Sequence, residues 1–251
     1  MVQITSPLIL LAELPKDFQL SDLNLSGKNG ERILFNTQKY SDLEVIEAIL
    51  DGMAFTLTHL TRDETHQNLE IEKLSKIFCK TPRYTVSGIA ISLGDNLSGG
   101  GHITPVNRAL LELGYMIGQD IQAQAIIWVP ANQLVGFDYF GEATRQYVDG
   151  GPLPILVQVA IKDNEDQSFQ TTGLSYFAGQ EIFLSAPEEY TSSDTIKRLV
   201  RIAHDIATNG RIDNEVETDG LVDGERISFT PDAEKKRVHV KIHGSGTSEI
   251  D

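Results

Sequence analysis

The sequence predicts an α+β protein with a mixed, largely antiparallel β-sheet and helices packed on it. Strands follow one another without an intervening helix near both ends of the chain, and two strongly amphipathic helices interrupt them. Helices and strands therefore intermingle without strict alternation. This pattern favours an α+β sheet covered by helices on one side over a regular series of βαβ units.

The N-terminal half contains short apolar or alternating runs that are typical of strands. The predicted strands are Leu8–Glu13, Ile33–Phe35, Val45–Leu50, Met53–His59 and Thr85–Leu93. Asp51 and Gly52 separate two of them and favour a two-residue hairpin turn, because glycine accepts a positive φ. The run at 45–50 also fits the helical period, so a helix stays open there. The apolar residues from Leu69 to Phe78 fit one face of a further helix.

The clearest helix follows a glycine-rich loop, and we predict it over Thr104–Gly118. Thr104 can cap its free N–H groups, and Pro105 suits the first helical position. A second amphipathic helix is predicted over Ser193–Thr208, where Gly210 follows as a stop signal. The remaining predicted strands are Ala123–Val129, Pro154–Ile161, Thr172–Phe177, Glu181–Leu184, Arg226–Phe229 and Arg237–Ile242.

The domain organisation follows from one composition shift. A chain of 251 residues suffices for one large domain or two small ones. The polar, acidic stretch Arg211–Asp219 is the best linker candidate, and the strands after it are too few to fold alone. We predict a single α+β domain over 1–210, and a linker with a β-hairpin packed on the same domain over 211–243. The Gly/Ser-rich end at 244–251 is predicted to be disordered.

Charge and composition exclude some partners and indicate the cellular compartment. The net charge of −15 repels nucleic-acid backbones and anionic lipid, so neither nucleic acid nor membrane is expected as a partner. No apolar run reaches the roughly 18 residues of a membrane-spanning helix, and no signal peptide is recognisable. The single cysteine, Cys79, cannot form an intramolecular disulfide and fits a reducing compartment. These observations predict a cytoplasmic protein.

The segment from Phe137 to Tyr190 is strongly acidic, with nine acidic side chains against two basic ones. Aromatic residues lie among the acids, and aromatic side chains with a polar rim are common anchors of interfaces. The segment therefore predicts a binding surface for a basic partner, although a solvated acidic face is the simpler alternative. The predicted binding residues are Asp138, Tyr139, Phe140, Glu142, Asp149, Glu188, Glu189 and Tyr190.

The loop before the first predicted amphipathic helix offers a rival site. The residues from Leu97 to Gly101 resemble the signature loop of ABC-type ATPases, but no Walker A stretch accompanies them. Backbone N–H groups at a helix start can still bind an anion. The predicted anion-binding residues are Gly99, Gly100, Gly101, His102 and Thr104. A flexible connection between a strand and a helix is the alternative.

No motif points to a metal, a cofactor or a catalytic nucleophile. His59 and His66 enclose Asp63 and Glu64, but their spacing matches neither an HExxH helix nor a zinc-finger pattern. Cys79 lies beside apolar residues, where an inert thiol is expected. A G-x-S-x-G elbow does not occur in the sequence. We therefore expect no metal and no cofactor, and assign no catalytic residue.

A family resemblance rests on several strand and turn segments. They are Ala125–Ala131, Leu153–Val157, Thr171–Phe177 and Glu181–Ile182. Together they resemble a bacterial family catalogued as domain of unknown function 4261, over roughly residues 85–187. Membership would imply a shared fold and a bacterial cytosolic setting. It would imply no particular activity and no catalytic residues.

Three functional hypotheses follow from these patterns. The first is a non-enzymatic acidic binding protein with an immunity-like or scaffolding role toward a basic protein, because opposite charge accelerates encounter. The second is a hydrolase or transferase with an anion-binding site at residues 95–102. The third is a structural subunit that forms homo-oligomers through an exposed strand edge.

Overall fold

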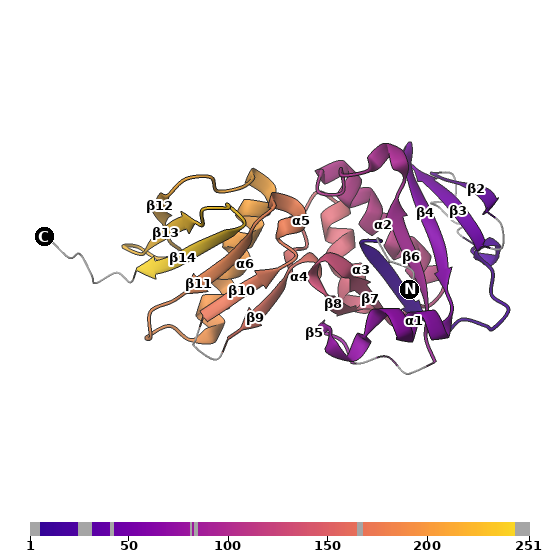
Figure 1. Ribbon diagram of the computed structural model, residues 1–251, viewed down its shortest axis with the longest axis horizontal. Helices are drawn as coiled ribbons and strands as arrows, with labels where there is room; N and C mark the ends of the chain where they lie inside the picture. Colours follow the sequence, from indigo (N-terminus) through magenta and orange to yellow (C-terminus); the bar gives the residue numbers. More distant parts are fainter. Residues whose placement is uncertain are drawn as a thin grey trace, which may run out of the picture. The chain divides into compact units, whose positions relative to one another are not determined.

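The computed structural model describes residues 6–24, 32–40, 43–80, 82, 85–164 and 168–243. The tail predicted at 244–251 lies outside the described residues. The chain is an α+β protein, which confirms the predicted fold class (Figure 1). Its strands form two mixed sheets rather than one. In each sheet all neighbouring strands run antiparallel except one parallel pair, β5 with β8 and β11 with β14.

The chain divides into two compact units, Met1–Val157 and Gln158–Asp251. This division differs from the single domain predicted over 1–210. Among the described residues, the strands from Ala160 onward pair with one another and not with the first sheet. The predicted linker and hairpin at 211–243 belong to this second sheet, so they complete the second unit instead of attaching to a larger domain.

The first unit contains an eight-stranded sheet with the order β2-β3-β4-β6-β1-β7-β8-β5. Its strands are β1 (Leu8–Ala12), β2 (Ile33–Tyr40), β3 (Leu43–Leu50), β4 (Met53–Leu60), β5 (Ser75–Ile77), β6 (Ser87–Leu93), β7 (Ala125–Trp128) and β8 (Gln133–Gly136). Its helices are α1 (Arg62–Leu69), α2 (Thr104–Asp120), α3 (Phe137–Val148) and α4 (Ile155–Gln158), which ends at the unit boundary. Short 3₁₀ turns are η1 (Leu20–Asp22), η2 (Ile71–Lys73), η3 (Asp95–Leu97) and η4 (Val129–Ala131).

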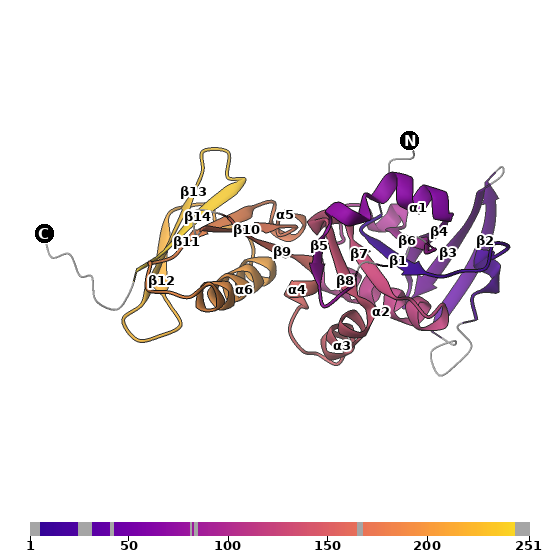
Figure 2. The ribbon, with the colours of Figure 1, turned by 90° about the horizontal axis from the view of Figure 1, so that it is seen from below.

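Helices cover both faces of this sheet, with α1 on one side and α2 and α3 on the other (Figure 2). All five residues of β1 are therefore buried. Ile9 and Leu11 belong to a core cluster that includes Ile71, next to α1. Leu8 faces Gly114 of α2, where a Cβ atom would overlap its side chain. The expected one-sided covering is wrong for this unit, because β1 is apolar on both faces.

The turn and the helix start that were predicted from local sequence are present in the structure. The hairpin of β3 and β4 turns at Asp51 and Gly52, whose φ angles of 50° and 81° are both left-handed, as this short turn requires. The helix predicted from Thr104 is α2, with Pro105 in its first turn. Trp128, the largest fully buried side chain, ends the central strand β7 and has no exposed surface.

The second unit contains a six-stranded sheet with the order β12-β13-β14-β11-β10-β9. Its strands are β9 (Ala160–Asp163), β10 (Ser168–Thr172), β11 (Glu181–Ser185), β12 (Val216–Asp219), β13 (Arg226–Pro231) and β14 (Arg237–His243). The long helix α6 (Ser192–Asn209) lies along one face of the sheet (Figure 2), and α5 (Ser175–Ala178) is a single turn. Buried and exposed residues alternate strictly along β14, so its other face is solvated.

One predicted helix was misplaced. The helix expected from Leu69 to Phe78 instead ends at Leu69, because Glu70 adopts a left-handed conformation with φ 36°. Thr61 and Glu64 form a capping box that starts it: the Thr61 N–H donates to the Glu64 carboxylate at 2.8 Å. The helix α1 therefore lies before the predicted one, and the apolar residues after Leu69 contribute to η2 and β5.

Two predicted strands were also wrong in part. The apolar run at 154–161 folds as α4 followed by β9, since a short apolar run does not distinguish strand from helix. The strand expected at 172–177 stops at Thr172. The Glu181 carboxylate accepts hydrogen bonds from the N–H groups of Gly173 and Ser175 at 2.9 and 3.0 Å, which favours the helical turn α5. In the part of the chain that the structure describes, no helix combines the length and apolarity needed to cross a bilayer.

Candidate functional site

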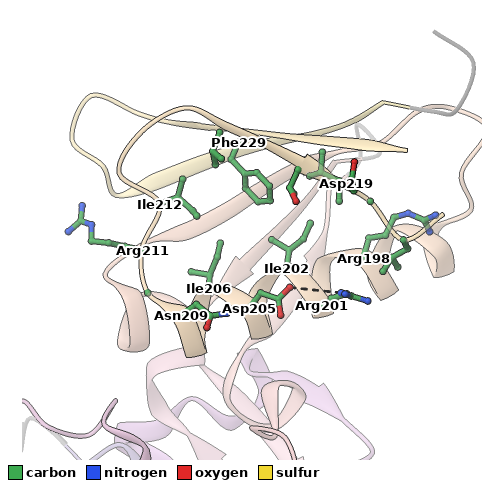
Figure 3. A pocket seen from close by; sticks show the side chains of 16 residues that line it. Arg198, Arg201, Ile202, Asp205, Ile206, Asn209, Arg211, Ile212, Asp219 and Phe229 are labelled. Carbon is green, nitrogen blue, oxygen red and sulfur yellow. Dashed lines mark ion pairs between the residues drawn. The ribbon is translucent and has the colours of Figure 1, made fainter. Parts of the chain in front are cut away.

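The second unit contains a pocket of about 420 Å³ between α6 and the strands β12 and β13 (Figure 3). Ile202 and Ile206 point from α6 toward the strands, and Phe229 points back toward the helix (Figure 3). The apolar lining consists of Ile202, Ile206, Ile212, Val216, Leu221, Ile227 and Phe229. Its volume lies within the range of about 300–1,000 Å³ that is usual for ligand pockets. The interior therefore suits an apolar group.

The pocket arises from two different periodicities. Ile202 and Ile206 stand four residues apart, which places them on the same face of α6. Ile227 and Phe229 stand two residues apart on β13 and face the helix from the sheet. Gly210, at φ 102°, ends α6 and lets the chain turn back toward the sheet. The pocket lies between the apolar face of α6, this returning segment and β12.

The returning segment is held by one buried side chain. Gln180 has no exposed surface, and its amide donates to the carbonyl oxygens of Ile212 and Lys235 at 2.8 and 2.9 Å. Its own oxygen accepts from the Ile212 N–H at 2.8 Å. These three hydrogen bonds fix the wall of the pocket that Ile212 forms.

Arg198, which lines the pocket, forms a buried ion pair with Glu225. Glu225 is 1% exposed, and Arg198 donates to its carboxylate through Nε at 3.0 Å and Nη2 at 2.6 Å. The Tyr190 hydroxyl donates to the same carboxylate at 3.0 Å, and the Arg198 guanidinium lies 4.6 Å from the Tyr190 ring centroid. The Leu221 N–H is a further donor at 3.1 Å. This network fixes the loop that leads from β12 to β13.

The network shifts the protonation of its members. Burial alone would raise the pKa of Glu225, but the hydrogen bonds from Arg198, Leu221 and Tyr190 outweigh burial and hold that pKa below its usual value. The hydrogen bond to Glu225 raises the pKa of Arg198. Burial, followed by the hydrogen bond to Glu225, raises the pKa of Tyr190. All three shifts favour a charged Arg198–Glu225 pair with a protonated tyrosine.

Charged side chains at the mouth of the pocket are paired within the chain. Arg211 contacts Asp213 at 3.0 Å, and Asp219 contacts Arg226 at 2.6 Å. Arg201 lies 3.9 Å from Asp205, the ion pair drawn in Figure 3. These pairs compensate most of the charge that lines the opening.

The segment from Asp213 to Asp223, part of which lines the pocket, is strongly acidic. Between residues 213 and 223 the sequence has five acidic residues and no basic one. They are Asp213, Glu215, Glu217, Asp219 and Asp223, and all five are exposed. We call these five residues the acidic rim. Val216, Leu221 and Val222 lie among them as exposed apolar side chains. The wall of the pocket that this segment forms thus has exposed acids beside exposed apolar side chains.

The predicted binding residues are distributed over both units. Asp138 and Glu142 lie on α3 and Asp149 follows its last turn, and all three are exposed. Glu188 and Glu189 are exposed residues of the second unit, just before α6. Asp138, Glu142 and Asp149 thus belong to the first unit, and Glu188 and Glu189 to the second. One acidic face built from all of them stays a prediction.

The three predicted aromatic anchors have different environments. Phe140 is fully buried in the core beneath α3, so it cannot anchor a partner, and this part of the prediction is wrong. Tyr190 is occupied by the network with Arg198. Tyr139 is half-buried, and its ring lies 4.6 Å from that of Phe78. Phe78 is 72% exposed and was not predicted as part of any site, because it was assigned to the apolar face of a helix.

The glycine-rich loop is ordered by its own backbone. The N–H groups of Gly100 and Ile103 donate to the carbonyl oxygens of Leu97 and Gly100 at 2.8 and 2.9 Å, so neither points to an anion. Gly99 and His102 are exposed, whereas Gly101 is buried and accepts a hydrogen bond from the Asn107 side chain. Ile103, not Thr104, stands at the N-cap, and no side chain caps the helix. Thr104 instead hydrogen-bonds with Tyr147. The anion site here stays a prediction.

The histidine group considered for a metal does not form a ligand cluster. Groups of three or more His, Cys, Asp or Glu side chains that could hold a metal ion do not occur within the described ranges. His59 instead stacks edge-on against Phe18 at 5.3 Å between ring centroids. Cys79 is half-buried, and burial raises the pKa of its thiol.

No family model, curated protein or solved structure matches this chain. The resemblance to domain of unknown function 4261 accordingly stays a prediction. The functional reading therefore depends on the site itself. The pocket was missed in the sequence because its second wall lies in the segment interpreted as a linker. The apolar residues Val216, Leu221 and Val222, which interrupt an acidic stretch, were the available signal.

Proposed function

We propose that this protein acts by binding a basic protein partner, with the pocket and the acidic rim as the recognition site. The observation that carries this proposal is the acidic rim: five exposed carboxylates lie along the segment that forms one wall of an apolar pocket. Apolar cores with polar surrounds are the usual anatomy of protein interfaces.

Charge supports a basic partner. The whole chain has a net charge of −15. In the rim, Asp213 and Asp219 are paired with arginines, and Glu215, Glu217 and Asp223 add negative charge beside them. Opposite charge on a partner raises the association rate and excludes acidic competitors. The effect falls with added salt, because screening limits the field to about 8–10 Å near physiological ionic strength.

The state of the polar groups supports binding over catalysis at this site. Arg198 and Glu225 satisfy one another in the buried network, and Arg211 and Asp219 have ion-pair partners at the surface. A catalytic acid or base must be able to exchange a proton with a substrate. We therefore infer that these ion-paired side chains stabilise the fold and do not act as catalytic acids or bases. A hydrolase or transferase at residues 95–102 stays the alternative prediction.

A charge reversal at the rim is the direct test. The variant Glu215→Lys/Glu217→Lys changes two exposed residues of the rim. A partner is first captured from a lysate of the native host, and its binding to the purified full chain is then measured by stopped-flow kinetics. We expect the rim variant to associate at least about tenfold more slowly at low salt. The difference should shrink as salt is added.

The matched control is Asp138→Lys/Asp149→Lys, which makes the same change in net charge on and beside α3. This control should retain the wild-type rate to within about twofold. If the control loses binding and the rim variant keeps it, the surface on α3 is the site instead. A captured partner that is itself acidic, or one that is indifferent to both reversals, would contradict the proposal.

A further inference from the structure

The edge of the second sheet suggests how a partner is held. Resting on the proposed binding function, we propose that β12 adds an extended, basic segment of the partner along its outer edge. An apolar side chain of that segment then fills the pocket beside β12. Strand addition of this kind combines main-chain hydrogen bonds for affinity with side-chain pockets for specificity.

The first argument is the position of β12 in the sheet. It is the terminal strand, and it pairs on one side with β13, from Val216 opposite Phe229 to Asp219 opposite Arg226. All four of its residues are exposed. In an antiparallel terminal strand every second residue directs its N–H and C=O groups away from the sheet. Over the described residues the outer edge of β12 is therefore a template for one more strand.

The second argument is that the pocket and the edge share residues. Val216 and Thr218 of β12 line the pocket, together with Ile202 and Ile206 of α6. A strand added beside β12 would place alternate side chains on the helix-facing side of the sheet, because side chains alternate between faces. One of them would then stand at the pocket opening. Val222, 52% exposed, provides apolar surface on the adjoining loop.

The third argument is charge, which favours a basic segment over a second copy of this chain as the strand that pairs with β12. Glu215 and Glu217 are exposed acids in and beside β12, and the rim has no basic residue. A second copy of this chain would bring an edge with the same acids beside this one, and like charges on neighbouring strands are destabilising. Charged residues commonly protect an edge strand against such self-association. In a segment with lysine or arginine alternating with apolar residues, the basic side chains can pair with the acids of the rim and an apolar side chain can fill the pocket.

Peptide selection on the full chain tests this inference. A display library of random short peptides is selected for binding, and an enriched peptide is then titrated by calorimetry. We expect enriched sequences with basic and apolar residues in alternation. We then expect N-methylation of one alternating set of backbone nitrogens to weaken binding by at least about tenfold, and methylation of the other set to change it little. Each N-methyl group removes a backbone donor and leaves the side chain unchanged.

The outcomes separate this inference from the proposed function. If basic peptides are enriched but neither methylated set loses affinity, strand addition is overturned and the binding function stands. If enriched peptides show no basic bias, the basic-partner function itself fails. A chain that sediments as a dimer, and that Glu217→Lys changes to a monomer, would show that a second copy occupies the edge and would overturn the inference.

Discussion

Replacing Glu225 with glutamine should lower the free energy of unfolding of the second unit by about 3 kcal/mol or more. Glutamine keeps the shape but removes the charge, so Arg198 would remain buried without its counter-ion. The Arg198 and Glu225 side chains are 10% and 0% exposed, so water cannot replace the lost partner cheaply. Hydrogen exchange followed by mass spectrometry on the full chain measures the effect, since it reports each segment separately.

A double variant provides the control for this prediction. Arg198→Met/Glu225→Leu removes both charges together, and an apolar pair of similar volume often matches a buried ion pair in stability. It should recover much of the stability that Glu225→Gln loses. Trp128, the one tryptophan of the chain, lies in the first unit. Its fluorescence reports the unfolding of that unit and serves as an internal reference for the second. Equal stability of wild type and Glu225→Gln would show that the network does not hold the fold.

The pH dependence of the same variant has a definite sign. Because the pKa of folded Glu225 lies below its usual value, the ion pair contributes fully above the unfolded pKa and is lost as the pH falls through the folded one. Protonated Glu225 resembles glutamine. The stability difference between wild type and Glu225→Gln should therefore stay constant from about pH 7 down to the unfolded pKa of about 4.3, and shrink as the pH falls further.

Replacing Leu199 with alanine should destabilise the second unit by about 3 kcal/mol, the typical cost of a cavity in a core. Leu199 lies on the buried face of α6 and has no exposed surface. Ile196 lies on the same helix, within the predicted amphipathic range Ser193–Thr208, but is only half-buried in the structure. Ile196→Ala on the same helix is therefore the matched control, with an expected loss of about 1 kcal/mol.

Urea denaturation of the full chain, with exchange of α6 amides as the local readout, distinguishes the two variants. Neither change affects a capping residue: the N-cap is Thr191, which accepts a hydrogen bond from the Asp194 N–H at 3.2 Å. Losses of equal size at both positions would mean that Ile196 is as buried as Leu199, and would contradict the burial described along α6.

Local signals predicted the elements that depend on local physics. Pro105, the Asp51-Gly52 turn and the stop at Gly210 each act within a few residues, and α2, the β3–β4 hairpin and α6 were placed well. The helix α1 shows the same rule in reverse. The sequence contains its capping box at Thr61 and Glu64, but the prediction followed the apolar spacing from Leu69 to Phe78 instead.

The candidate site was not predictable in this way, because its walls are distant in sequence. The pocket joins α6 with a segment up to Phe229, and it depends on Gln180 binding Ile212 across the fold. The strand β12 has no apolar alternation of its own and exists because β13 pairs with it. Whether such a segment forms an edge strand depends on its tertiary contacts. Its polar composition alone indicated a linker.

Site-specific photo-crosslinking tests the central claim, that the pocket and acidic rim of the second unit receive the partner. A photoreactive phenylalanine analogue replaces Val222 in one sample and Asp138 in another, and each is irradiated in the presence of the captured partner. The account predicts a covalent adduct from position 222, beside the pocket, and little or none from position 138 on α3. An adduct from position 138 with none from position 222 would contradict it.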